Sequence, residues 1–127
     1  MNQIALLSGS MFGFLAIILG AFGAHLLKKK LNQEQLLSFE TGVKYQMYHA
    51  LVLLVIGFQF DVNITSLKFA IYGFILGTIL FSFSIYGLVL SSANNKKLKF
   101  LGPITPVGGL ILVFSWGILI YRSIVGF

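Results

Sequence analysis

The chain of 127 residues contains no cysteine, two prolines and only three acidic residues, Glu34, Glu40 and Asp61. Without cysteine there is neither a disulfide framework nor a thiolate metal site. Because carboxylates are so scarce and the only histidines are His25 and His49, we expect no metal site of any other kind.

Signatures of catalysis are missing as well. No serine lies in a nucleophile elbow, and no glycine-rich loop precedes a helix where it could hold a phosphate. The glycines lie inside apolar segments instead. We therefore expect a protein that is not an enzyme and that carries no cofactor.

Apolar residues dominate what is present. They make up 57% of the chain, and the mean hydropathy is +0.95, which is more than a small soluble core can bury. Four apolar segments cover residues 4–27, 41–60, 67–90 and 104–121, each near the ~20 residues that a helix needs to cross a bilayer. None alternates as a barrel strand does, and lipid offers the backbone no hydrogen bonds. The sequence thus predicts one all-α domain over residues 1–127, a bundle of four transmembrane helices.

The basic residues predict how the chain is threaded. The first apolar segment has no positive residues before it, so it is expected to be a retained span rather than a secretory signal. Four spans would place the first and third loops on one side of the membrane. These loops carry the lysines Lys28, Lys29, Lys30, Lys96, Lys97 and Lys99. The positive-inside rule then puts both basic loops in the cytoplasm and both termini outside.

The charge also bears on partners. A net charge of +6 would suit nucleic acid, but these lysines lie in short loops between apolar segments. Anionic lipid headgroups are therefore the expected partner, and we expect no nucleic acid.

Two helix starts can be predicted. Asn32 followed by Gln35 has the pattern of a capping box, which predicts that the second helix begins before the membrane with an amphipathic lead-in. The apolar face of this lead-in fits either packing on the bundle or contact with the lipid surface. Thr105 and Pro106 fit an N-cap followed by proline at the first helical position, where the fourth span would start.

Small residues recur at helical spacing. Gly9 and Gly13, continuing through Ala16 and Gly20, follow one face of the first segment, and Gly73 and Gly77 do so on the third. This spacing lets helix backbones approach closely, either within one molecule or between copies in a homo-oligomer.

Depth along the helices decides which polar groups can meet. At 1.5 Å per residue, His25 and Glu40 lie about 30 Å from the far ends of their spans, whereas His49 lies only about 16 Å in. His25 could therefore bond Glu40 at the cytoplasmic border. His49, near the middle of the membrane, would need a neutral partner such as Thr78 or Ser82. An offset of about 15 Å argues against a haem iron held by both histidines.

The polar side chains of this region form the candidate ligand-binding cluster: His25, Glu40, Lys44, Tyr45, His49 and Ser82. Two interpretations stay open. The cluster could supply interhelical hydrogen bonds that fix the bundle, or it could form a proton relay or a polar ligand pocket. Tyr45 and Tyr48 beside His49 could also bind a headgroup or a quinone.

Five motifs run through nearly the whole chain: Gly20-Ala21-Phe22-Gly23-Ala24-His25, Phe39-Glu40-Thr41, Tyr45-Gln46-Met47-Tyr48-His49, Phe81-Ser82 with Ser84-Ile85-Tyr86, and Thr105-Pro106-Val107-Gly108-Gly109, which ends near Trp116. Together they resemble the uncharacterised YgdD/YwdK-type family of small bacterial membrane proteins, which has small eukaryotic transmembrane relatives. The resemblance implies a four-span protein of the bacterial plasma membrane with no established activity. It supports five residues of the cluster as motif positions, namely His25, Glu40, Tyr45, His49 and Ser82. Further motif or packing positions are Gly20, Gly23, Ser84, Thr105, Pro106, Gly108 and Gly109.

The expected function is a structural subunit, or one that binds lipid or a membrane-protein partner. Two alternatives remain from other classes. One is a small transporter or proton-conducting protein that uses His25, Glu40 and His49, and the other is a redox subunit that binds quinone or haem.

Overall fold

In the computed structural model, which describes residues 2–127, the chain is helical and contains no strand within that range. The helices are α1 (Asn2–His25), α2 (Gln33–Gln59), α3 (Thr65–Thr78), α4 (Ser84–Ala93) and α5 (Ile104–Val125). A π-helical turn, η2 (Ile79–Phe83), joins α3 to α4 without a break, and short 3-10 turns lie at η1 (Leu27–Lys29) and η3 (Lys99–Leu101).

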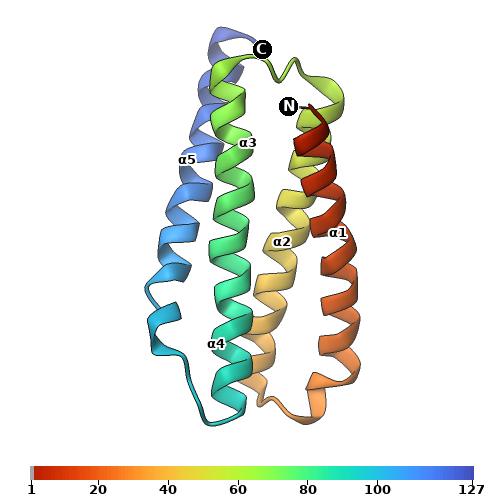
Figure 1. Ribbon diagram of the computed structural model, residues 1–127, viewed down its shortest axis with the longest axis vertical. Helices are drawn as coiled ribbons and strands as arrows, with labels where there is room; N and C mark the ends of the chain where they lie inside the picture. Colours follow the sequence, from red (N-terminus) through yellow and green to blue (C-terminus); the bar gives the residue numbers. More distant parts are fainter. Residues whose placement is uncertain (1) are drawn as a thin grey trace.

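The helices lie side by side along one long axis (Figure 1). The two termini lie at one end, together with the α2–α3 connection. The α1–α2 and α4–α5 connections, which hold the two lysine groups, lie at the other end (Figure 1). We call this the lysine end.

Three helical segments are long and apolar enough to cross a membrane: Asn2–His25, Thr65–Ala93 and Lys99–Val125. They lie where three of the four apolar segments of the sequence lie. The fourth apolar segment belongs to α2, which is 27 residues long but more polar, since it also carries Lys44, Gln46 and His49. Gln46 and His49 are buried inside the molecule and do not face outward.

The start of α2 follows from its cap. Asn32 Oδ1 accepts a hydrogen bond from the Gln35 backbone N–H at 2.8 Å, and Gln35 Oε1 accepts one from the Asn32 N–H at 3.0 Å. Two donors that the first turn would leave unpaired are thereby satisfied. The predicted capping box is confirmed, and the helix continues unbroken to Gln59.

The predicted cap of the last helix is wrong. Helix α5 begins at Ile104, after Pro103, so Thr105 and Pro106 lie inside its first turn. Proline is tolerated there because the first four N–H groups of a helix have no intrahelical acceptor. The Thr105 hydroxyl is hydrogen-bonded to the Ser84 hydroxyl on α4 and does not cap its own helix.

Small residues bring the helix pairs α1–α2 and α3–α5 together. A Cβ at Gly9 would lie 2.8 Å from the Ala50 carbonyl oxygen of α2, and one at Gly77 would lie 3.1 Å from the Gly108 carbonyl oxygen of α5. Both glycines are therefore used for packing within one molecule.

The outer surface is apolar. Phe14, Phe58 and Leu110 expose 68%, 71% and 69% of their surface, and many other large apolar side chains are exposed as well. In water a continuous surface of this kind would promote aggregation, whereas lipid chains solvate it.

Candidate functional site

A layer of polar side chains lies inside the molecule, around the middle of α2. Gln46, with none of its surface exposed, stands at its centre. Its Nε2 donates to the Phe12 carbonyl oxygen of α1 at 2.8 Å, and its Oε1 accepts from the Tyr86 hydroxyl of α4 at 2.7 Å. One amide thus connects three helices, and both of its ends are satisfied.

Ser82 adds a second link. Its hydroxyl, in the π-helical turn η2, donates to the Gly42 carbonyl oxygen of α2 at 2.7 Å. The close approach needs a glycine, because a Cβ at Gly42 would lie 2.7 Å from Cε1 of the Tyr86 ring.

His49 is held from both sides. Its Nδ1 lies 2.6 Å from the Tyr45 carbonyl oxygen, and Trp116 Nε1 donates to its Nε2 at 3.1 Å. A carbonyl only accepts and an indole N–H only donates, so the arrangement fits the neutral ring with its proton on Nδ1. Neither nitrogen is left free for a metal or a haem iron.

The partner expected for His49 is therefore wrong. Ser82 bonds Gly42, and the Thr78 hydroxyl is buried without a hydrogen-bond partner among the described residues. From the sequence, His49 could be paired with Thr78 or Ser82 only by depth along the helix axis. Depth does not show which way a side chain points around the helix, and the ring of His49 faces Trp116 on α5.

The expected contact between His25 and Glu40 is also absent. Both residues are exposed, and no hydrogen bond or ion pair joins them in the part of the chain that the structure describes. The reason is the rotation of α1. Gly23 of α1 packs on the ring of Phe39, where a Cβ would lie 2.8 Å from Cε1, and Glu40 borders α1 at Gly23 and Ala24. His25, about 100° further round the helix than Ala24, is not part of this contact.

Glu40 and Lys44 line a hollow of about 160 Å³ between α1 and α2, together with Gly20 and Gly23. Tyr45 and Tyr48 are both largely exposed and lie with their ring centroids 5.7 Å apart. Three of the six residues in the predicted cluster belong to the buried layer. Tyr45 contributes its backbone carbonyl, and His49 and Ser82 contribute their side chains. His25, Glu40 and Lys44 lie outside it.

Three residues of the layer were missed as site residues: Gln46, Tyr86 and Trp116. A polar side chain inside an apolar segment was the available signal for Gln46, and Tyr86 lies in one of the quoted motifs. Trp116 gave no such signal, because tryptophan is also common at the membrane–water interface, where it needs no buried partner.

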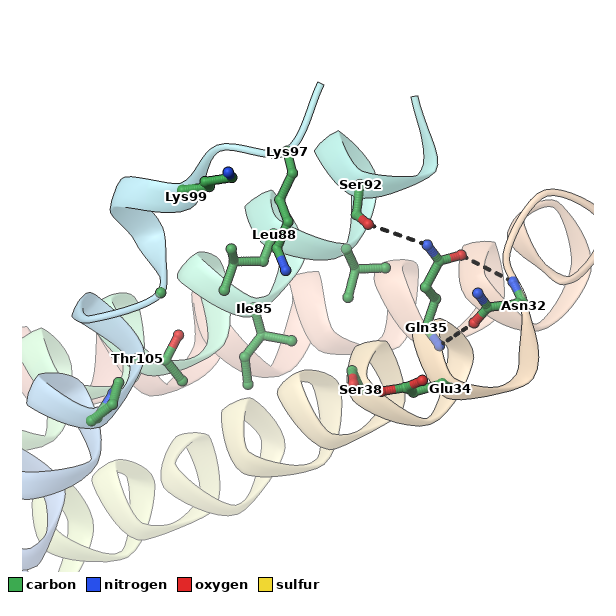
Figure 2. A pocket seen from close by; sticks show the side chains of 13 residues that line it. Asn32, Glu34, Gln35, Ser38, Ile85, Leu88, Ser92, Lys97, Lys99 and Thr105 are labelled. Atoms are coloured by element: carbon green, nitrogen blue, oxygen red, sulfur yellow. Dashed lines mark hydrogen bonds between the residues drawn. The ribbon is translucent and has the colours of Figure 1, made fainter. Parts of the chain in front are cut away.

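A cleft of about 690 Å³ lies at the lysine end. It lies between the start of α2, the α4 helix and the start of α5 (Figure 2). Gln35, besides capping α2, donates through Nε2 to the Ser92 hydroxyl of α4 at 3.5 Å and so closes one side of the cleft. The residues that line it are Asn32, Glu34, Gln35, Ser38, Ile85, Leu88, Val89, Ser92, Lys97, Lys99, Gly102, Thr105 and Pro106.

The cleft combines three kinds of surface. Its floor is apolar, with Ile85, Leu88 and Val89 from α4. Lys97 and Lys99 come from the α4–α5 connection, and Glu34 lies across from them on α2 (Figure 2). No group of three or more metal-ligating side chains occurs within residues 2–127. The cleft is thus suited to a ligand with a charged end and an apolar end.

An all-helical molecule that has three membrane-crossing candidates, an apolar outside and a polar interior belongs to the class of helical membrane proteins. The chain belongs to the family described as "Protein of unknown function (DUF423)", whose model matches residues 19–109. That stretch includes every residue that lines the cleft.

The relatives are membrane proteins by name. The chain is 36% identical over 124 residues to the UPF0382 membrane protein YwdK of Bacillus subtilis, with 96% of this chain and 97% of the relative covered. It is 36% identical over 121 residues to the UPF0382 membrane protein SAB0533 of Staphylococcus aureus, with 95% of each covered. With the UPF0382 inner membrane protein YgdD of Escherichia coli it shares 32% identity over 125 residues, covering 97% and 91%. No solved structure matches the chain. The resemblance inferred from the motifs is confirmed.

Proposed function

We propose that this protein is a non-enzymatic subunit of the bacterial plasma membrane, with four spans, whose lysine end binds anionic lipid headgroups at the cytoplasmic surface. The observation that carries the proposal is the gathering of six lysines at one end of the molecule (Figure 1). No ion pair within residues 2–127 engages them, so their charges are available to lipid.

The fourth span is α2. At 1.5 Å per residue its 27 residues measure about 40 Å, which exceeds a hydrocarbon layer of about 30 Å. Gln46 and His49 do not oppose this placement, because both are buried and hydrogen-bonded. The exposed Lys44 lies nearer the lysine end, and a long lysine side chain can extend to the headgroups. With α2 as a span, both lysine groups lie on one side, which the positive-inside rule makes the cytoplasm, and both termini lie outside.

The extra length of α2 is its first two turns, at the lysine end. Phe39 is buried there against α1 and Tyr86, while Glu34 and Leu37 are exposed. The apolar face of this lead-in therefore packs on the bundle, and its other face lies at the level of the headgroups.

The buried polar layer supports a structural role over a proton path. Gln46 forms its hydrogen bonds with α1 and α4, and His49 forms its own with α5 and with the Tyr45 carbonyl oxygen of the same helix. Neither side chain therefore has a group left for relaying a proton. Bonds of this kind fix the rotation and register of neighbouring helices. The apolar outer surface is then free for lipid, for a second copy or for a membrane-protein partner.

The test is lipid selectivity. The full chain is placed in nanodiscs of phosphatidylcholine and phosphatidylglycerol at 3:1, and the lipids that stay with it after mild detergent extraction are counted by native mass spectrometry. We expect phosphatidylglycerol to be enriched, and the enrichment to fall as salt is raised, because surface charges are screened.

Two triple variants replace the lysines by glutamine, one at Lys28 to Lys30 and one at Lys96, Lys97 and Lys99. Each keeps one basic loop, so the insertion signal is not lost altogether. Lys68→Gln, at the opposite end, is the matched control. The proposal fails if both triple variants retain as much phosphatidylglycerol as the wild-type protein and the control.

A further inference from the structure

We propose that the cleft at the lysine end is a specific site for one monoanionic phospholipid whose headgroup carries hydroxyl groups. The phosphate lies between Lys97 and Lys99, the headgroup hydroxyls donate to Glu34 and Ser38, and the start of an acyl chain lies on the apolar floor. The inference rests on the proposed lipid-binding function and goes beyond it, since it replaces diffuse attraction by one site.

The size of the cleft fits a single headgroup with its glycerol backbone. At about 690 Å³ it lies within the range of about 300–1,000 Å³ that is usual for small-molecule sites. The hollow between α1 and α2, at about 160 Å³, is too small for the same ligand.

The basic side of the cleft calls for an anion. Figure 2 shows the Lys97 side chain reaching over Leu88 toward Ile85, with Lys99 beside it on the same connection. Both lysines are exposed, so their ammonium groups are accessible to a phosphate, with which they form charge-assisted hydrogen bonds. Neither lysine forms an ion pair within residues 2–127.

The opposite side favours a hydrogen-bond donor. Asn32 Oδ1 and both ends of the Gln35 amide are occupied by the capping box and by Ser92, which leaves the Glu34 carboxylate and the Ser38 hydroxyl as the cleft-lining side chains of α2 that form no hydrogen bond among the described residues. A carboxylate only accepts. Glycerol hydroxyls supply hydrogen-bond donors to it, whereas the quaternary ammonium of a choline headgroup has no N–H and supplies none.

The net charge of the cleft lining indicates the class of ligand. Two lysines and one glutamate give the lining a formal charge of +2 − 1 = +1. A monoanionic phospholipid neutralises it, while a zwitterionic one leaves the positive charge uncompensated.

The floor and the position of the cleft complete the match. Ile85, Leu88 and Val89 offer an apolar surface that continues from the lysine end along α4 toward the interior of the membrane. A lipid whose phosphate is at the lysines would have its first methylenes on these side chains.

The experiment uses the full chain in nanodiscs with equal parts of phosphatidylglycerol, phosphatidylethanolamine and phosphatidylcholine. Retained lipids are counted by native mass spectrometry. We expect one phosphatidylglycerol to remain bound after the other lipids have been stripped. Lys97→Gln with Lys99→Gln should weaken its apparent affinity about 30-fold, which corresponds to about 1 kcal/mol for each lysine.

The matched control is Lys28→Gln with Lys29→Gln, which removes the same charge from the same end but outside the cleft. It should lower the total number of phosphatidylglycerol molecules retained, as the proposed surface binding requires, but keep the one lipid that remains after stripping. Leu88→Trp fills the floor without changing any charge and should remove it. An equal loss in both lysine pairs would refute the cleft and leave the proposed surface binding intact. Equal retention of phosphatidylcholine or phosphatidylethanolamine would refute the headgroup assignment. If no anionic lipid is enriched on the wild-type protein at all, the proposed function fails as well.

Discussion

Gly108 gives the sharpest test of how the helices pack, because its neighbour Gly109 is a built-in control. A Cβ at Gly108 would lie 2.4 Å from the Phe81 backbone nitrogen and 2.8 Å from the Leu80 carbonyl carbon, whereas at Gly109 it would lie 3.7 Å from the Phe81 ring. Ordinary contact begins near 3.4 Å, so Gly108→Ala falls short by 3.4 − 2.4 = 1.0 Å. The obstacle is the backbone of η2, which cannot rotate away as a side chain can.

Helix α5 must therefore move away from η2, and the Ser84–Thr105 hydrogen bond near the same contact would be strained. Overpacking of this kind costs about 1–3 kcal/mol. Both variants gain the same helix propensity, about 1 kcal/mol for alanine over glycine, so this gain cancels in the comparison. We expect Gly108→Ala to be less stable than Gly109→Ala by about 1–3 kcal/mol.

The assay is reversible unfolding in mixed micelles by added dodecyl sulfate, followed by far-ultraviolet circular dichroism. The comparison between adjacent alanines removes the effects of detergent and of helix propensity. A difference smaller than about 0.5 kcal/mol, the usual scatter of neutral substitutions, would refute the close approach of α5 to η2.

Three further predictions follow from the interior and the threading. In a double-mutant cycle, Gln46→Leu and Tyr86→Phe should couple by about 0.6–2 kcal/mol, because the two side chains share a buried hydrogen bond; additive effects on unfolding would contradict that bond. Trp116, the only tryptophan, lies 12 residues into α5, about 18 Å from its start. Its fluorescence should be quenched more by bromines deep in the acyl chains than by bromines near the headgroups, and the reverse order would place it at the surface. The absence of cysteine makes the threading testable with single cysteines: in intact cells an impermeant maleimide should label Asn63→Cys but not Lys28→Cys or Lys96→Cys. The same result at Asn63→Cys and Lys28→Cys, with the opposite result at Lys96→Cys, would mean that α2 does not cross the membrane.

Much of the architecture could be predicted because it depends on local composition. The length of the apolar segments and the lack of alternation were enough for an all-helical membrane protein, and Asn32 with Gln35 was enough for the start of α2. These features depend on neighbours along the chain, and the hydrogen bonds of a helix join residues four apart. Five motifs spread over the chain were likewise enough for the family.

The candidate site was predicted less well. Depth along a helix predicted that His49 lies far from the ends of its segment, and the structure buries it, but the same arithmetic paired His25 with Glu40 and His49 with Thr78 or Ser82. A shift of one residue turns a side chain by about 100°, so packing contacts such as Gly23 on Phe39 decide which residue faces inward. The lysines of the cleft were recognised singly, as headgroup contacts, and not as one wall of a cavity.

By itself, then, the sequence determined that the chain is helical, that it belongs in a membrane and that six of its eight lysines lie in two short connections. Only the tertiary structure decided that Gln46 links three helices, that His49 meets Trp116, and that Glu34 faces Lys97 and Lys99 across a cleft. The physical reason is the range of the interactions. Hydrophobicity and capping act within a helical turn or a single segment, whereas these contacts join residues 34 to 67 positions apart and require the rotation of every helix to be fixed first.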